Sequence, residues 1–113
     1  MFFPEGNVRV WLYTEPTDMR RSFKGLSAMV KNQLQEDPLS GQLFVFINRR
    51  RTQMKVLYFD RTGYCIWSKQ LVQGQFNYKS SQACKRALNL FELKALLEGI
   101  ELKKTRQYKR FSR

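Results

Sequence analysis

The sequence contains no histidine and only two cysteines, Cys65 and Cys84, which are far apart in the chain. A structural zinc site takes four Cys or His ligands, so this chain cannot supply one from its own side chains. The lack of histidine also excludes hydrolysis by a serine or cysteine nucleophile with a His base. We therefore expect no metal centre and no cofactor, and we expect both cysteines to be free thiols.

Long apolar runs are also missing, because no stretch approaches the roughly 18 apolar residues that a membrane span needs. The first six residues lack the basic region and the apolar core of a signal peptide. The content of 42% hydrophobic and 14% aromatic residues is typical of a globular domain. These features predict a cytoplasmic protein without a membrane partner.

Acidic residues are scarce, with nine Asp and Glu against 21 Lys and Arg, and the net charge is +12. The imbalance is confined to residues 49–113, which carry 16 of the basic residues and four acidic ones, whereas residues 1–48 are neutral. A folded domain gains nothing from such self-repulsion, so the asymmetry points to a polyanionic partner. Nucleic acid is the commonest polyanion in a cell.

The few acidic residues also bear on catalysis. Nucleases and transposases that transfer phosphoryl groups hold two metal ions on several converging carboxylates. The candidates here are Asp18, Asp37 and Asp60, and each lies at a turn or a helix start, where an Asp has an ordinary structural use. We therefore predict that the protein is not an enzyme.

The hydrophobic pattern predicts an α+β fold, with residues 1–101 as a single domain. Short strands joined by tight turns indicate an antiparallel meander of about four or five strands. The expected strands span residues 8–13, 43–47, 54–59 and 64–71, with a short one around residues 76–78.

Two helices are expected beside these strands. Apolar residues every three or four positions from Met19 to Leu34 predict one long helix, packed on the sheet and capped by Thr17 or Asp18.

The second helix lies near the C-terminus, where Asn89 and Glu92 have the spacing of a capping box. Its apolar stripe contains Leu93, Leu96 and Leu97, and Gly99 lies where a left-handed C-cap belongs. Residues 102–113 contain several basic residues and no acidic one, and we expect them to form a flexible tail.

Two basic segments are candidates for binding nucleic acid. Arginines in a hairpin loop would project together, and the planar fork of each guanidinium can donate two hydrogen bonds to a phosphate. Basic tails bind nucleic-acid backbones through counterion release. For both segments the alternative is a solvated stretch without a specific partner. The candidate residues are Arg49, Arg50, Arg51 and Lys55 in the loop, and Lys103, Lys104, Arg106, Lys109 and Arg110 in the tail.

A set of aromatic residues is interleaved with lysines between these two segments. Aromatic side chains on a basic sheet could stack on unpaired bases, although such residues more often form the core of a small domain. The set comprises Tyr58, Tyr64, Trp67, Phe76 and Tyr78.

Several short motifs follow one another in a characteristic order. They are Thr17-Asp18-Met19-Arg20, Asp37-Pro38, Ser40-Gly41, Leu43-Phe44-Val45-Phe46, Asn48-Arg49-Arg50, Lys55-Val56-Leu57 and Leu96-Leu97-Glu98-Gly99-Ile100. Over about residues 4–101 their order and spacing resembles the TnpB accessory proteins of bacterial insertion sequences of the sixty-six type. The resemblance implies a role in DNA transposition beside a separate transposase that carries the catalytic acids. It also implies that the basic hairpin of the family corresponds to Asn48, Arg49, Arg50 and Lys55.

Two hypotheses of function follow. In the leading one, the protein is a non-catalytic accessory of transposition that binds DNA, mostly through its backbone. In the alternative, it is a protein–protein adaptor that contacts the transposase through Arg20, Arg21 and the apolar surface near Leu96, without binding DNA.

Overall fold

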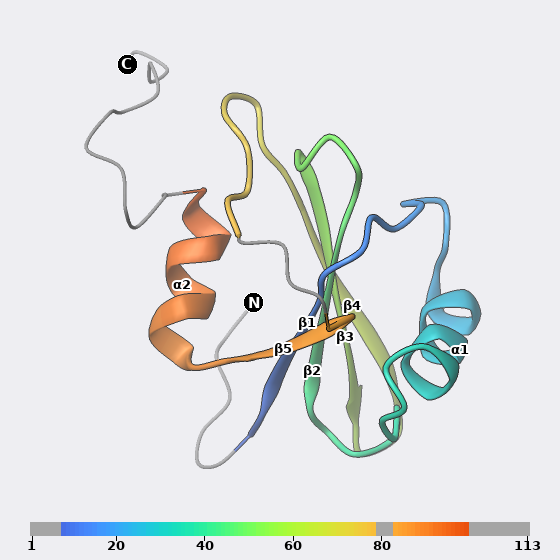
Figure 1. The fold of residues 1–113 in the computed structure, drawn as a ribbon. Coiled ribbons are helices and arrows are strands. Elements are labelled where there is room, and N and C mark those ends of the chain that lie inside the picture. Colours follow the sequence, from blue (N-terminus) through green and yellow to red (C-terminus); the bar gives the residue numbers. More distant parts are fainter. Residues whose placement is uncertain (1–7, 79–82, 100–113) are drawn as a thin grey trace.

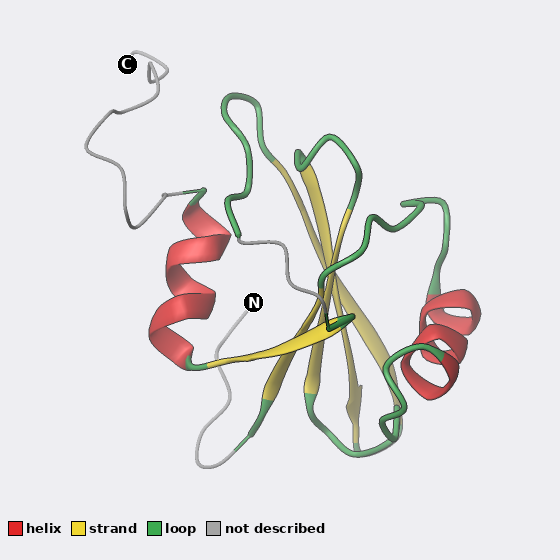
Figure 2. Cartoon of the chain, viewed as in Figure 1, coloured by secondary structure: helices red, strands yellow, loops and turns green. Residues whose placement is uncertain are grey.

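The computed structural model of the protein describes residues 8–78 and 83–99. A five-stranded sheet lies at the centre, and one helix covers each of its faces (Figures 1 and 2). In chain order, the elements are β1 (Val10–Tyr13), α1 (Phe23–Asn32), β2 (Leu43–Ile47), β3 (Gln53–Asp60), β4 (Gly63–Gln70), β5 (Lys85–Leu88) and α2 (Leu90–Glu98). The predicted α+β class is therefore confirmed.

The order of strands in the sheet is β4-β3-β2-β1-β5. β2, β3 and β4 form the antiparallel meander that the turns predicted. β1 lies parallel to β2, with Val10 opposite Leu43, and β5 pairs antiparallel with β1. The prediction of a wholly antiparallel sheet was thus wrong, because the chain crosses between β1 and β2 through α1, and such a crossover makes two neighbouring strands parallel.

The fifth strand is not where the sequence placed it. Residues 76–78 belong to a loop, and the strand next to β1 is β5, which the sequence did not predict. β5 is short and begins with Lys85 and Arg86, so it has little of the apolar pattern that marks a strand. These two basic residues are accommodated by ion pairs with Glu36 and Glu92.

β2 divides the core into two layers, since all five of its residues are buried, as its continuous apolar run predicted. Leu43, Val45 and Ile47 face α2, whereas Phe44 and Phe46 face α1. The buried residues that the helices add are Leu26, Met29 and Val30 from α1 and Leu93, Leu96 and Leu97 from α2.

α1 begins later and is shorter than the apolar spacing predicted. Its N-cap is Ser22, whose side chain makes no capping hydrogen bond, so the predicted cap at Thr17 or Asp18 was wrong. The segment before it instead runs across the end of the sheet, where the Thr17 amide donates to the Ile47 carbonyl at 2.9 Å. This bond holds residues 16–21 beside the turn that joins β2 to β3.

Side chains also hold the β2–β3 turn in place. The Asn48 carboxamide oxygen accepts hydrogen bonds from the amides of Thr52 and Gln53, at 2.9 and 3.0 Å. Arg51 adopts a left-handed conformation, with φ of 61°. Its guanidinium donates to the Tyr78 carbonyl at 3.1 Å and lies 4.1 Å from the centre of the Tyr78 ring. The loop after β4 is thereby attached to the turn.

The ends of α2 are as the sequence predicted. The side chain of Asn89 accepts a hydrogen bond from the Glu92 amide, and the Glu92 carboxylate accepts one from the Asn89 amide. Gly99 closes the helix in the left-handed conformation, with φ of 75°. The capping box and the C-cap are therefore both confirmed.

We expect Asn89→Ala to lower the free energy of unfolding by about 1 kcal/mol, because the Glu92 amide loses its only side-chain acceptor. Asn89→Asp keeps an acceptor oxygen at the same position and should stay close to wild type. Urea denaturation followed by circular dichroism would measure both variants. Equal stability of Asn89→Ala and wild type would contradict the role given to the cap.

We expect Arg51→Ala to lower the free energy of unfolding by about 1–2 kcal/mol, because it removes a hydrogen bond and a cation–π contact that hold the loop after β4. Arg50→Ala is the matched control. Arg50 is exposed in the same turn, so its loss should change the stability by less than about 0.5 kcal/mol. A similar effect of the two substitutions in urea denaturation would show that Arg51 does not hold the loop.

Candidate functional site

The β2–β3 turn presents two of its three arginines to solvent. Arg49 and Arg50 are exposed, and no acidic side chain pairs with either of them among residues 8–78 and 83–99. Arg51 is half-buried against Tyr78 and holds the loop after β4. The loop arginines that the sequence grouped together thus differ in their surroundings.

Lys55 lies away from the exposed turn. It stands on β3 opposite Phe46, on the sheet face that α1 covers. Its ammonium group donates to the carbonyl of Arg21 at 2.7 Å. Lys55 therefore connects the sheet to the segment before α1.

The segment of residues 16–21 contributes an ion pair and a further arginine. The guanidinium of Arg20 contacts the carboxylate of Asp18 at 2.7 Å, and the Arg20 amide donates to the same carboxylate at 2.9 Å. Hydrogen bonds from the side chain and then the backbone of Arg20 lower the pKa of Asp18 to about 2. The charge of Arg20 is thus balanced by Asp18, whereas Arg21 forms no ion pair in the described part of the chain and only adds a weaker lowering of the Asp18 pKa through its charge.

Two hollows adjoin this segment, one on each side of it. The first, which we call the helix-side hollow, has a volume of about 590 Å³ and lies between the segment and α1. The second, the turn-side hollow, has a volume of about 530 Å³ and lies between the segment and the β2–β3 turn. Both hollows are lined by Thr17, Asp18 and Arg49, so the two hollows are neighbouring parts of one surface.

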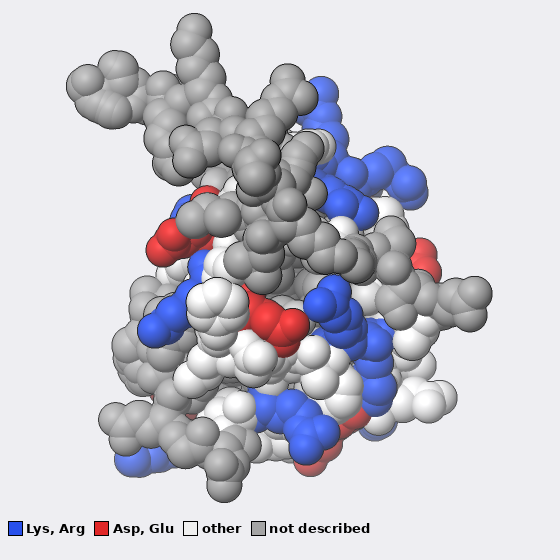
Figure 3. Space-filling view, turned by 60° about the vertical axis from the view of Figure 1, so that its left-hand side comes forward, with Lys and Arg blue, Asp and Glu red and all other residues white. Residues whose placement is uncertain are grey.

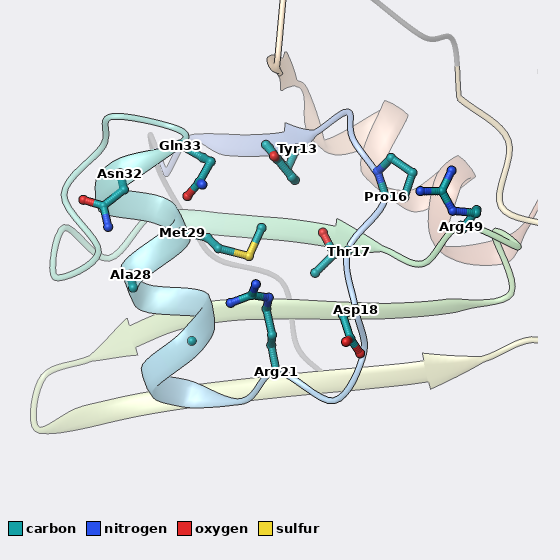
Figure 4. Close-up of a pocket in the computed structure, with 11 residues that line it drawn as sticks. Tyr13, Pro16, Thr17, Asp18, Arg21, Ala28, Met29, Asn32, Gln33 and Arg49 are labelled. Atoms are coloured by element: carbon teal, nitrogen blue, oxygen red, sulfur yellow. The ribbon is translucent and has the colours of Figure 1, made fainter.

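Arginines from two distant parts of the sequence meet at this surface. Arg21 and Arg49 line the helix-side hollow, where Figure 4 shows Thr17 lying between them. Arg20 and Arg50 line the turn-side hollow together with Arg49. The sequence assigned Arg20 and Arg21 to a protein partner and Arg49 and Arg50 to nucleic acid, but the structure places all four around one surface.

Thr17 is a site residue that the sequence marked only as a candidate helix cap and as part of a family motif. Its side chain is 4% exposed, and its hydroxyl group has no hydrogen-bond partner among the residues that the structure describes. Only its amide is bound, to the Ile47 carbonyl. The sequence gave no signal that Thr17 is buried at this surface, because the bond that places it comes from a strand 30 residues away.

Many of the other basic side chains are already engaged within the fold. Lys85 pairs with Glu36 and Arg86 with Glu92, while Lys69 donates to the Leu97 carbonyl at 2.6 Å. Figure 3 shows basic side chains in several separate groups on one face of the molecule, with acidic side chains beside some of them. The basic side chains drawn in blue do not form one continuous patch in this view.

The remaining candidates are the residue for partner binding on α2 and the residues for DNA binding in the tail. Leu96 is only 5% exposed and packs in the core, whereas Leu90 and Phe91 of α2 reach the surface, with Phe91 68% exposed. The tail candidates, which are Lys103, Lys104, Arg106, Lys109 and Arg110, lie outside the described residues.

The aromatic residues proposed for base stacking belong to the core. Phe76 is fully buried, and Tyr58, Trp67 and Tyr78 pack against the apolar cluster beneath α2. Tyr64 packs against the cluster beneath α1. This packing supports the interpretation of the set as core, with Phe76 buried and the other four side chains partly buried.

The acidic residues do not converge. In the part of the chain that the structure describes, no group of three or more His, Cys, Asp or Glu side chains is placed to hold a metal ion. Asp18 pairs with Arg20, and the Asp37 side chain accepts from the Leu39 amide in a turn.

Of the described helices, none is long and apolar enough to cross a membrane.

Comparison with known proteins places the chain in a family. The sequence model of the family described as "IS66 Orf2 like protein" matches residues 8–107. Two proteins of Sinorhizobium fredii (strain NBRC 101917 / NGR234) are similar along most of their length. "Uncharacterized protein y4hO" is 40% identical over 99 residues, which cover 87% of this chain and 86% of the relative. "Uncharacterized protein y4jC" is 30% identical over 101 residues, which cover 89% and 86%.

No solved structure matches this chain significantly. The family match covers both arginine-bearing segments, which are residues 16–21 and the β2–β3 turn. The resemblance seen in the motifs is thereby confirmed, and the chain belongs to the IS66 Orf2-like family, whose members are accessory proteins of insertion-sequence transposition.

Proposed function

We propose that this protein serves transposition without catalysing it, by binding the phosphate backbone of DNA through the β2–β3 turn and the adjoining arginines. The observation that carries the proposal is the placement of Arg49, Arg50 and Arg21. None of them forms an ion pair in the described part of the chain, and the turn and segment that bear them are held to the end of the sheet. The role in insertion-sequence transposition follows from the family to which the chain belongs.

The geometry suits phosphate better than it suits base edges. A guanidinium offers paired donors that match two oxygens of one phosphate, and the hydrogen bonds of Asn48 fix the backbone of the turn that carries these groups. Contacts to phosphate position a protein on DNA without reading the sequence. We therefore expect binding with little sequence preference, to which the basic tail adds further counterion release.

A second candidate function rests on the exposed apolar side chains of α2. Leu90 is 38% exposed and Phe91 is 68% exposed, and they are neighbours at the start of the helix. Exposed aromatic and aliphatic side chains are favoured anchors in protein interfaces. In this alternative, α2 contacts the transposase of the same element, and the protein acts as an adaptor.

The first test removes the two free arginines of the turn. Each phosphate contact on duplex DNA contributes about 0.9 to the slope of log affinity against log salt concentration. We expect the double variant Arg49→Ala, Arg50→Ala to flatten this slope by up to about 2 and to weaken binding at low salt. Fluorescence anisotropy with a labelled duplex at several salt concentrations would measure the slope. Arg51 is left in place because it holds the loop after β4.

The matched control removes two charges elsewhere. Lys31 is exposed on α1, and Arg61 is exposed in the turn at the other end of β3. The double variant Lys31→Ala, Arg61→Ala lowers the net charge equally, so it should retain the wild-type slope to within about 0.5. A slope unaffected by loss of Arg49 and Arg50 would remove the turn from the interface.

The second test separates the two candidate functions. We expect the protein to be recovered with the transposase of its element in a pull-down, and to be lost from it after nuclease treatment, because DNA connects the two. Phe91→Asp should not alter recovery in the untreated sample. Association that survives nuclease but is abolished by Phe91→Asp would favour the adaptor over DNA binding.

A further inference from the structure

The helix-side hollow combines the groups that recognise a nucleotide. α1 forms one wall with Gly25, Ala28, Met29 and Asn32, and the segment before α1 forms the opposite wall (Figure 4). Gly25 leaves room for Arg21, whose Cβ would lie 3.3 Å from any Cβ added at that glycine. The hollow is thus bounded by a helix on one side and by arginine-bearing backbone on the other.

Its polar groups are divided between two regions. The guanidinium groups of Arg21 and Arg49 lie toward the segment of residues 16–21, and the side-chain amides of Asn32 and Gln33 lie at the C-terminal end of α1 (Figure 4). Met29 supplies apolar surface between them. Each guanidinium suits a phosphate, while carboxamide groups can both donate to and accept from a base edge.

The neighbourhood of Thr17 and Asp18 fits an anionic occupant. The Asp18 carboxylate is already compensated by Arg20, so it opposes a phosphate less than a free carboxylate would. The buried Thr17 hydroxyl has no hydrogen-bond partner in the described part of the chain. Thr17 also lines the hollow.

The size and shape of the hollow favour an unpaired nucleotide over a duplex. A volume of about 590 Å³ lies within the range of about 300–1,000 Å³ that is usual for small-ligand sites. In a duplex, the Watson–Crick edges are paired and the ring faces are stacked, so a concave site cannot enclose a single base. Single strands can turn a base out of the stack and present its edge to side chains.

We propose that the helix-side hollow binds one nucleotide of single-stranded DNA, with the phosphates on its two sides bound by Arg21 and Arg49 respectively and its base against Asn32, Gln33 and Met29. This site rests on the proposed function and extends it. The DNA backbone would bind the β2–β3 turn, and an unpaired nucleotide would bind the hollow. The protein then distinguishes single strands from duplexes, which the exposed turn arginines alone do not.

The test fills the hollow without changing the charge. Ala28 is exposed and lines the hollow, and Ser27 precedes it on α1 but does not line the hollow. Fluorescence anisotropy would measure the affinity of each variant for a labelled 12-nucleotide single strand and for a duplex of the same length. We expect Ala28→Trp to bind the single strand at least tenfold more weakly and the duplex within twofold of wild type. Ser27→Trp should match wild type on both.

A second pair of variants tests the charge. Arg21 lines the hollow, and Lys24 is exposed on α1 outside it. We expect Arg21→Ala to weaken single-strand binding at least tenfold, and Lys24→Ala to weaken it less than threefold. Circular dichroism and thermal unfolding would establish that all four variants fold.

The outcomes separate this inference from the proposed function. If Ala28→Trp leaves single-strand affinity within twofold of wild type, or weakens duplex binding equally, the nucleotide site is refuted while backbone binding by the turn stands. Duplex binding by the wild type without single-strand binding would refute the site in the same way. If the wild type binds neither oligonucleotide, the proposed function fails as well.

Discussion

β2 is buried on both of its faces, and this burial governs the rest of the architecture. A strand of Leu, Phe, Val, Phe and Ile places large apolar side chains on each face of the sheet, and both faces must be covered to remove them from water. α1 covers Phe44 and Phe46, and α2 covers Val45 and Ile47. Since α1 lies between β1 and β2 in the chain, covering that face also makes β1 parallel to β2.

The same crossover creates the candidate site. To reach α1 from β1, the chain passes over the end of β2, where the Thr17 amide binds the Ile47 carbonyl. The next residue after β2 begins the turn that bears Arg49 and Arg50. The arginines of the segment and of the turn are therefore neighbours because one strand ends where the crossover passes.

Charge alone was an incomplete guide to the functional surface. Lys85 and Arg86 form ion pairs, Lys69 binds a helix carbonyl, and Arg51 holds a loop, so several basic residues have structural roles. Arg49, Arg50 and Arg21 differ in forming no ion pair among the described residues. Which cations are available to an anion depends on what surrounds each one after folding.

The sequence by itself determined the features that are encoded within a few residues. The capping box of Asn89 and Glu92, the left-handed Gly99 and the buried run of β2 were all predicted correctly, because caps and short apolar runs act locally. The motifs of the chain also determined its family.

The tertiary structure alone decided the start of α1, the strand β5 and the gathering of Arg20, Arg21, Arg49 and Arg50 around one surface. Each of these depends on a partner far along the chain, such as the Ile47 carbonyl for Thr17 or Glu36 for Lys85. Local propensity carries no information about such partners, so the sequence could name the arginines but could not bring them together.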